Sequence, residues 1–198
     1  MGKLKSIYSA LLNRGKKIMR KKEIVQLIED YNNKIKKVSV TNALWYLSRQ
    51  NYIKRIFLYY YYINSIEERE LKFCKYMDKE LLFLVLNKLD VKWYLGLTSA
   101  RYSGGETWQT PNMLIVVNDR FSGERIIAGL KSRFIKIKKS LIFGLIKEKT
   151  ENGIEYYYSD KEKTKLDEVY LSRKGKIIIT KKTKNYLKKY PKWLQKLT

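Results

Sequence analysis

The sequence predicts an α+β protein, and three observations indicate this fold class. Apolar residues recur at helical spacing in the N-terminal quarter of the chain. Between residues 52 and 63, and again after Pro111, they alternate or run continuously, as strands do. The chain has 198 residues, 44% of them hydrophobic, which is enough to bury a core in one large or two small domains. We expect an N-terminal domain over 1–64, a connector over 65–77 and a C-terminal domain over 78–198.

The N-terminal part is expected to form three short helices followed by two strands. The predicted helices cover residues 4–12, 20–31 and 39–50, and the predicted strands cover 52–57 and 59–63. This order is typical of a winged helix-turn-helix, in which the strand pair forms the wing. The tyrosine run 59–62 would suit base stacking. We favour the alternative, a strand whose rings alternate between core and surface.

The third predicted helix has two chemically different sides, and Ser39 is its expected N-cap. The inward side consists of Val40, Ala43, Leu44 and Leu47. On the outward side, an asparagine can bond adenine and an arginine can bond guanine. The candidate base-reading residues are Ser39, Thr41, Asn42, Trp45, Tyr46 and Arg49. The alternative is an ordinary solvated helix face on which Trp45 packs against a second domain.

The charge of the chain favours nucleic acid as a partner. Lys and Arg number 43 against 19 Asp and Glu, a formal net charge of +24. Adaptation to heat enriches both signs, so it does not explain this excess. A polyanion would relieve the repulsion among the cations, and an anionic membrane surface is the less favoured polyanion. The candidate phosphate-contacting residues are Arg20, Lys21, Lys22, Lys37, Lys54 and Arg55.

Composition argues against several other classes of protein. The chain has no histidine, so the usual general base and most catalytic zinc sites are missing. Its one cysteine, Cys74, allows neither an internal disulfide nor a cysteine-rich metal site. We therefore expect no catalytic residues, no metal and no cofactor. No apolar run approaches the ~20 residues of a membrane span, and no signal peptide is recognisable, so we expect a cytoplasmic protein without a membrane partner.

The C-terminal part is expected to combine helices with a small, mostly antiparallel sheet. Asn152-Gly153 between two β-rich segments is a strong hairpin signal. The predicted helices cover 64–74, 78–89, 93–105, 160–171 and 183–196, with Asp78 and Asp160 as caps. The predicted strands cover 113–117, 134–138, 141–147, 154–158 and 177–180. After Val169 the chain contains no acidic residue, which makes its end a second electropositive zone.

Two segments of this part resemble a known family. Residues 93–111 read WYLGLTSARYSGGETWQTP, and residues 160–167 read DKEKTKLD. Both are similar to motifs of the AbiEi-type antitoxins, the regulator halves of type IV abortive-infection toxin–antitoxin pairs. The order of the predicted elements is also similar over nearly the whole chain. Wings of that family usually turn on a glycine, whereas residues 57–59 contain none.

The resemblance implies a transcriptional regulator that binds repeats in its own promoter through its N-terminal domain. It also implies a C-terminal domain that opposes a nucleotidyltransferase-like toxin, without necessarily forming a stable complex with it. Because helix-turn-helix proteins usually pair on two half-sites, we expect a homodimer on double-stranded DNA. Within the second motif, Glu162 and Lys163 stand near a helix start, where we expect them to serve helix polarity and surface pairing.

The sequence is also compatible with two other functions. A metal-dependent nuclease needs clustered carboxylates and a lysine, and the nearest pattern is Asp90-Val91-Lys92 with Asp78 or Glu80 upstream. A non-specific nucleic-acid-binding protein would need only the basic surface. The sequence contains no RNA-recognition motif.

Overall fold

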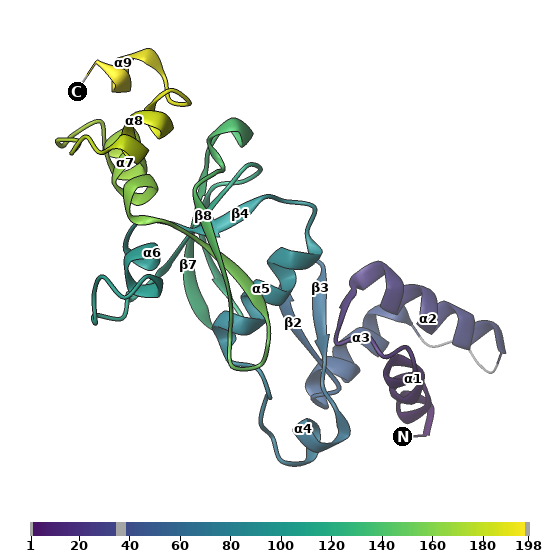
Figure 1. The fold of residues 1–198 in the computed structure, drawn as a ribbon. Coiled ribbons are helices and arrows are strands. Elements are labelled where there is room, and N and C mark those ends of the chain that lie inside the picture. The colour runs from purple at the N-terminus through teal and green to yellow at the C-terminus, as the bar shows by residue number, and fades with distance from the viewer. Residues whose placement is uncertain (1, 35–38, 197–198) are drawn as a thin grey trace. The chain divides into compact units, whose positions relative to one another are not determined.

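The computed structural model describes residues 2–34 and 39–196, which form helices and two β-sheets (Figure 1). The chain divides into two compact units, Met1–Val85 (unit 1) and Leu86–Thr198 (unit 2). The dividing point lies inside helix α5 (Asp78–Lys88). In the part of the chain that is described, no helix is long and apolar enough to cross a membrane.

The described part of unit 1 begins with the order helix, strand, helix, helix, strand, strand. These elements are α1 (Gly2–Asn13), β1 (Ile18–Arg20), α2 (Lys21–Lys34), α3 (Val40–Arg49), β2 (Ile53–Phe57) and β3 (Tyr60–Ile63). The helices and the strand pair confirm the elements predicted from periodicity. Strand β1 was not predicted, because three residues are too few to reveal a repeat.

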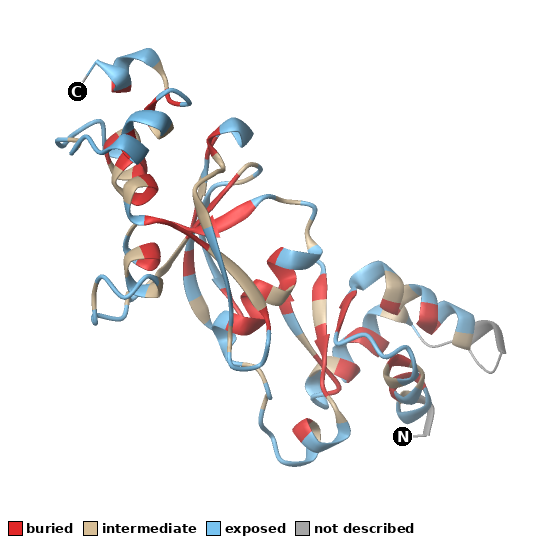
Figure 2. Ribbon diagram, in the orientation of Figure 1, coloured by how far each residue is buried: buried red, intermediate tan, exposed pale blue. Residues whose placement is uncertain are grey.

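Helices α1, α2 and α3 pack around one apolar core. Ile7 and Leu11 of α1, Ile24 of α2 and Leu47 of α3 are completely buried in it. Burying one such side chain contributes about 1.5–3 kcal/mol. Figure 2 shows buried and exposed residues on different sides of these helices. Each helix therefore keeps one side for the core and presents the other to solvent.

The three strands of unit 1 form an antiparallel sheet in the order β1-β3-β2. Tyr60 and Tyr62 of β3 are buried, whereas Tyr61 is half-buried and Tyr59 is 67% exposed. These tyrosines therefore alternate between core and surface, as we expected. The turn between β2 and β3 contains Leu58 in the left-handed region, at φ = 49°, which replaces the missing glycine.

The connector expected over 65–77 belongs structurally to unit 1. Ser65 is the N-cap of its helix α4 (Ile66–Glu70) and forms a capping box with Glu68. The buried carboxylate of Glu68 also accepts a hydrogen bond from the Tyr62 hydroxyl at 2.6 Å. This bond ties the segment to β3, and the chain divides into its two units after Val85.

Unit 2 contains a six-stranded mixed sheet in the order β6-β7-β5-β4-β9-β8. Its strands are β4 (Trp93–Leu95), β5 (Leu114–Asn118), β6 (Gly123–Ile127), β7 (Leu130–Lys136), β8 (Leu145–Lys149) and β9 (Glu155–Ser159). The pairs β4–β9 and β5–β7 are parallel, and the other three pairs are antiparallel. The sheet is therefore larger than the small sheet that we expected, and it is mixed although three of its five pairs are antiparallel.

The helices of unit 2 are grouped beside this sheet (Figure 1). They are α6 (Leu97–Ser103), the short 3-10 helix η1 (Lys139–Leu141), α7 (Lys161–Ser172), α8 (Lys181–Leu187) and α9 (Lys192–Gln195). Helix α6 packs against β5, β9 and α7, and α7 packs against α8. As predicted, Asp160 caps α7, because its carboxylate accepts from the Lys163 backbone N–H at 2.8 Å.

Four predictions for the chain after residue 77 were wrong. Residues 93–95 form a strand rather than helix, because they pair with β5 and β9. Residues 177–180 pair with no strand, and 183–196 is divided into two helices by Pro191. Asp78 is the first residue of α5 rather than its cap; instead the Glu80 carboxylate accepts from the Met77 backbone N–H at 2.9 Å.

Gly96 marks the change from β4 to α6 and fits where no side chain would. A Cβ atom at this position would lie 2.6 Å from Cγ2 of Val117, closer than real Cβ contacts. Val117 is fully buried in the core of unit 2. The glycine therefore allows the β4–α6 junction to approach the neighbouring strand β5.

Candidate nucleic-acid interface

Helix α3 presents the predicted outward side to solvent. Its inward residues Ala43, Leu44 and Leu47 are buried, and Val40 is half-buried. All six candidate base-reading residues are exposed: Ser39, Thr41, Asn42, Trp45, Tyr46 and Arg49. Ser39 occupies the N-cap position, but its side chain makes no capping hydrogen bond. The arrangement brings an amide, hydroxyls and a guanidinium together on one side of a single helix.

The aromatic residues of this face organise its arginine. The guanidinium of Arg49 lies over the Trp45 ring, 4.9 Å from its centroid, as the i, i+4 spacing allows. Tyr46 packs edge-on against the same ring at a centroid distance of 4.8 Å. An exposed cation–π contact contributes about 0.5–1 kcal/mol. The contact restricts the directions that the Arg49 side chain can take, while 52% of Trp45 remains exposed.

Three candidate phosphate-contacting residues meet around the β2–β3 turn. Arg20 donates from Nε to the Tyr60 hydroxyl at 2.8 Å. The backbone N–H of Lys21 donates to the Tyr59 carbonyl at 2.6 Å. Arg55 donates from Nε to the Leu58 carbonyl at 3.1 Å. We call Arg20, Lys21 and Arg55 the turn cations.

The remaining candidate cations differ in their surroundings. Lys22 is exposed in the first turn of α2. Lys54 is half-buried, and its ammonium lies 3.5 Å from the Asp78 carboxylate, so it is already paired. Lys37 lies outside the described residues. No pattern in the sequence places Tyr59 beside the turn cations, because the pairing of β3 with both β1 and β2 brings them together.

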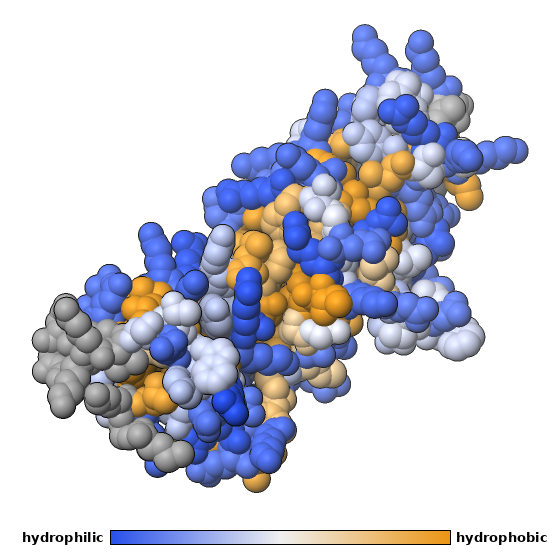
Figure 3. All heavy atoms as spheres, turned by 180° about the vertical axis from the view of Figure 1, so that it is seen from behind, coloured by the Kyte–Doolittle hydropathy of each residue, from blue (hydrophilic) through white to orange (hydrophobic). Residues whose placement is uncertain are grey.

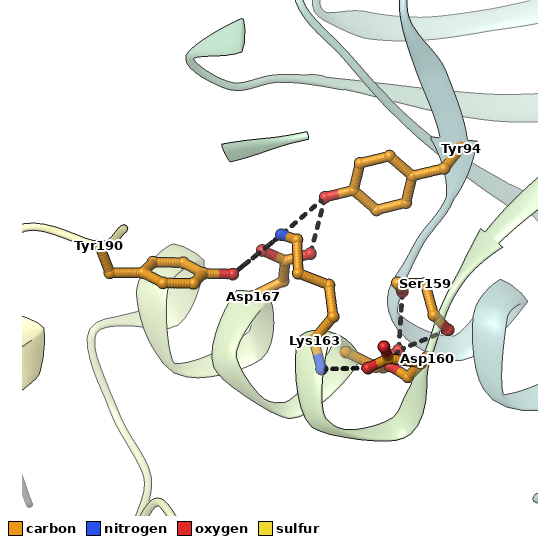
Figure 4. Close-up of polar contacts among 7 residues, drawn as sticks. Tyr94, Ser159, Asp160, Lys163, Asp167 and Tyr190 are labelled. Carbon is orange, nitrogen blue, oxygen red and sulfur yellow. Dashed lines mark hydrogen bonds and ion pairs between the residues drawn. The ribbon is translucent and has the colours of Figure 1, made fainter. Parts of the chain in front are cut away.

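Unit 2 contains a buried group of polar side chains, the polar clamp, which consists of Tyr94, Lys163, Asp167 and Tyr190 (Figure 4). The ammonium of Lys163 donates to Tyr94 at 3.1 Å, to Tyr190 at 2.8 Å and to the Asp167 carboxylate. Both tyrosine hydroxyls also donate to Asp167, each at 2.7 Å. All three hydrogens of the ammonium are therefore directed at partners within the clamp.

Burial shifts the ionisation of this clamp. It lowers the pKa of Lys163 and raises the pKa values of Tyr94 and Tyr190. The prediction that Lys163 serves surface pairing is wrong, since its side chain is 0% exposed. The clamp joins β4, α7 and the turn before α9, and we assign it a structural role.

The two segments that carry the family resemblance meet in unit 2. Tyr94, from residues 93–111, bonds Asp167 of α7. Arg101 of α6 pairs with Glu168 of α7 at 2.5 Å. Residues 73 and 67 positions apart in the chain thus form one packed region.

The carboxylates of the possible nuclease site each bind a different partner. Asp90 pairs with Arg120 at 2.8 Å, and Asp78 pairs with Lys54. Glu80 is buried at the start of α5, where it accepts the backbone bond described above. Among the described residues, no group of three or more acidic or cysteine side chains is placed to hold a metal ion.

Comparison with known proteins adds no assignment to this geometry. A scan against protein-family models and a search of curated proteins each gave no match.

Proposed function

We propose that this protein is a sequence-specific DNA-binding transcriptional regulator whose unit 1 acts as a winged helix-turn-helix. The observation that carries the proposal is the division of α3 into a buried side and an exposed side with Asn42, Trp45 and Arg49. Those side chains suit base edges in the major groove, which is wide enough for a helix. In this proposal α3 is the recognition helix.

The turn cations suit a second task, which is to hold the phosphate backbone. Phosphate contacts fix register and orientation, whereas base contacts select the sequence. Arg20 and Arg55 each use one Nε–H within unit 1, and a guanidinium has five N–H donors in all. We therefore assign Arg20, Lys21, Lys22 and Arg55 to phosphate binding and the outward face of α3 to sequence selection.

We further propose that the protein is the antitoxin-like component of a toxin–antitoxin pair in the cytoplasm and represses its own promoter as a homodimer. This part rests on the AbiEi-like residues of 93–111 and 160–171. It implies a nucleotidyltransferase-like toxin as a functional partner. A neighbouring reading frame that encodes such an enzyme, and whose toxicity this protein suppresses, is the expected finding. A neighbour of unrelated type would contradict this part alone.

Selection of genomic fragments by the full-length protein tests the DNA-binding proposal. We expect a few sites with two half-sites, separated by about 10–10.5 bp or a multiple. Arg49→Ala should weaken binding to a selected site by about 1–3 kcal/mol and binding to random duplex much less. Arg14→Ala, which removes an exposed arginine after α1, is the matched control and should leave the preference unchanged.

Three results would contradict this proposal. If Arg49→Ala weakened binding to selected and random duplexes equally, Arg49 would contact only phosphate. Competition by random duplex or RNA as strong as by a selected fragment would favour non-specific binding. Cleavage of plasmid DNA in the presence of Mg²⁺ or Mn²⁺ would favour a nuclease.

A further inference from the structure

The end of unit 2 carries a dense group of cations that α3 and the turn cations do not include. Between residues 173 and 196 the chain has ten basic residues and no acidic one. All ten are exposed: Arg173, Lys174, Lys176, Lys181, Lys182, Lys184, Lys188, Lys189, Lys192 and Lys196. We call this set the C-terminal basic surface. Figure 3 shows mostly hydrophilic side chains over this end of the molecule, at the upper right.

The backbone beneath this surface is held in place by buried side chains. Thr180 caps α8, because its hydroxyl accepts from the Thr183 backbone N–H at 3.0 Å. Leu187 and Leu194 are 5% and 0% exposed in the core of unit 2. Tyr190 between them belongs to the polar clamp. The lysines therefore project from backbone that is fixed by packing and capping rather than from an unpacked tail.

Few acidic groups neutralise these cations. Lys182 lies 3.1 Å from Asp160 and 3.4 Å from Glu162. Within the described residues, the other nine cations of the surface form no ion pair at salt-bridge distance. Such a concentration of one sign creates a strong positive potential that attracts a polyanion.

We infer that the C-terminal basic surface is a second binding site for the phosphate backbone of double-stranded DNA, separate from α3. The identity of the ligand as a duplex rests on the proposed function. Binding here adds affinity without sequence selection, since lysines contact phosphates as point charges.

An anionic membrane is the less suitable polyanion for this surface. A helix that lies on a membrane inserts an apolar side below the headgroups. The leucines of α8 and α9 are already buried in unit 2, which leaves lysines and the exposed Trp193 outward. The exposed Ile178 and Ile179 precede α8, so vesicle binding is included in the test.

The test compares two triple variants of the full-length protein with equal loss of charge. The first, Lys181→Gln/Lys184→Gln/Lys188→Gln, removes exposed cations of the surface. The control, Lys131→Gln/Lys136→Gln/Lys149→Gln, removes exposed lysines of β7 and β8 in the same unit. The affinity for a 40-bp duplex is measured from 50 to 200 mM salt. Circular dichroism checks that both variants fold.

We expect the first variant to reduce the slope of log K against log salt by about 0.9 for each phosphate that the protein no longer neutralises, and by at most about 2.7. The control should keep the slope of the unaltered protein. An unchanged slope in the first variant, or an equal change in both, would overturn the inference. Loss of binding to phosphatidylserine vesicles with an unchanged slope on duplex would assign the surface to a membrane instead.

Arg49→Ala separates this inference from the proposed function. If Arg49→Ala removes the sequence preference while the surface variant keeps the original slope, α3 reads DNA and the second site is wrong. If the surface variant lowers the slope while no fragment is preferred over random duplex, the surface binds DNA and the regulator proposal is wrong.

Discussion

At the scale of single residues, the polar clamp places one charged pair where charge is costly. Lys163 and Asp167 are both almost completely buried, and each depends on the other and on two tyrosine hydroxyls. Removal of one partner from a buried pair leaves an uncompensated charge, which destabilises a protein by about 3–5 kcal/mol.

Lys163→Met should therefore lower the free energy of unfolding by about 3–5 kcal/mol. Lys161→Met, at an exposed position of the same helix, is the control and should change it by less than about 0.5 kcal/mol. Denaturant titration of both variants measures the difference. A further change, Asp167→Leu, should restore part of the loss, because no unpaired charge then remains. Equal stability of the two lysine variants would show that the clamp does not stabilise unit 2.

Trp45 is expected to act through Arg49. Trp45→Ala removes the ring on which the guanidinium lies, so we expect a loss of sequence preference of up to about 1 kcal/mol. The combined variant Trp45→Ala/Arg49→Ala should lose less than the sum of the single variants, as coupled contacts do. The ratio of the dissociation constants for selected and random duplex measures this effect. Strict additivity would show that Trp45 contacts DNA independently.

At the scale of elements, the β2–β3 turn combines strain with the proposed role in phosphate binding. Leu58 adopts a left-handed conformation that costs a non-glycine residue about 1–2 kcal/mol. The Leu58 carbonyl nevertheless accepts a hydrogen bond from Arg55, and this carbonyl remains when the side chain is substituted.

Leu58→Gly should raise the free energy of unfolding by about 0.5 kcal/mol, since relief of strain exceeds the entropic cost of glycine. It should leave the affinity for DNA unchanged, because the turn cations keep their partners. Tyr59→Gly, at the next position, provides the comparison and should lower stability. Thermal unfolding and duplex titration test both statements, and a less stable Leu58→Gly would show that packing of the leucine outweighs its strain.

Local signals predicted the elements whose residues repeat over many positions. Helix α3 follows from Val40, Ala43, Leu44 and Leu47, and the β8–β9 hairpin follows from Asn152-Gly153. The apolar residues 93–95 were predicted as helix, because a short buried run fits both structures and only pairing decides between them. Strand β6 was not predicted, because its charged residues Glu124 and Arg125 are typical of a loop.

The outward residues of α3 could be selected from sequence because they lie on one helix. For two other groups the sequence could not predict which residues meet, because the groups form only in the folded chain. Arg20 and Arg55 come together through strand pairing with β3. Lys163 receives Tyr94 and Tyr190 from positions 69 and 27 residues away. No repeating pattern in the sequence predicts such contacts between residues that lie far apart in the chain.

At the scale of the whole molecule, buried tyrosines should control stability at alkaline pH. Burial raises the pKa values of Tyr62 in unit 1 and of Tyr94 and Tyr190 in unit 2. Above about pH 10 the unfolded chain releases these protons while the folded chain keeps them, so stability falls as pH rises. Lys163, whose pKa burial lowers, acts in the opposite direction, but only below about pH 10.4, where an unfolded lysine still keeps its proton.

We expect the free energy of unfolding to decrease between pH 10 and 11, by about 1.4 kcal/mol per pH unit for each uncompensated tyrosine. Urea titrations at pH 9, 10 and 11 measure the slope. Tyr190→Phe removes one of the protons concerned and should make the slope shallower. A slope that Tyr190→Phe leaves unaltered would show that Tyr190 ionises alike in the folded and unfolded chains.

The close approach at Gly96 has a consequence for tracing the ancestry of this chain. A methyl group at position 96 would collide with Val117, whatever the protein binds. Homologous proteins with this architecture should keep glycine there, or exchange it only together with a smaller residue at the position of Val117. That linked pair is a signature by which distant homologues can be recognised after most other positions have diverged.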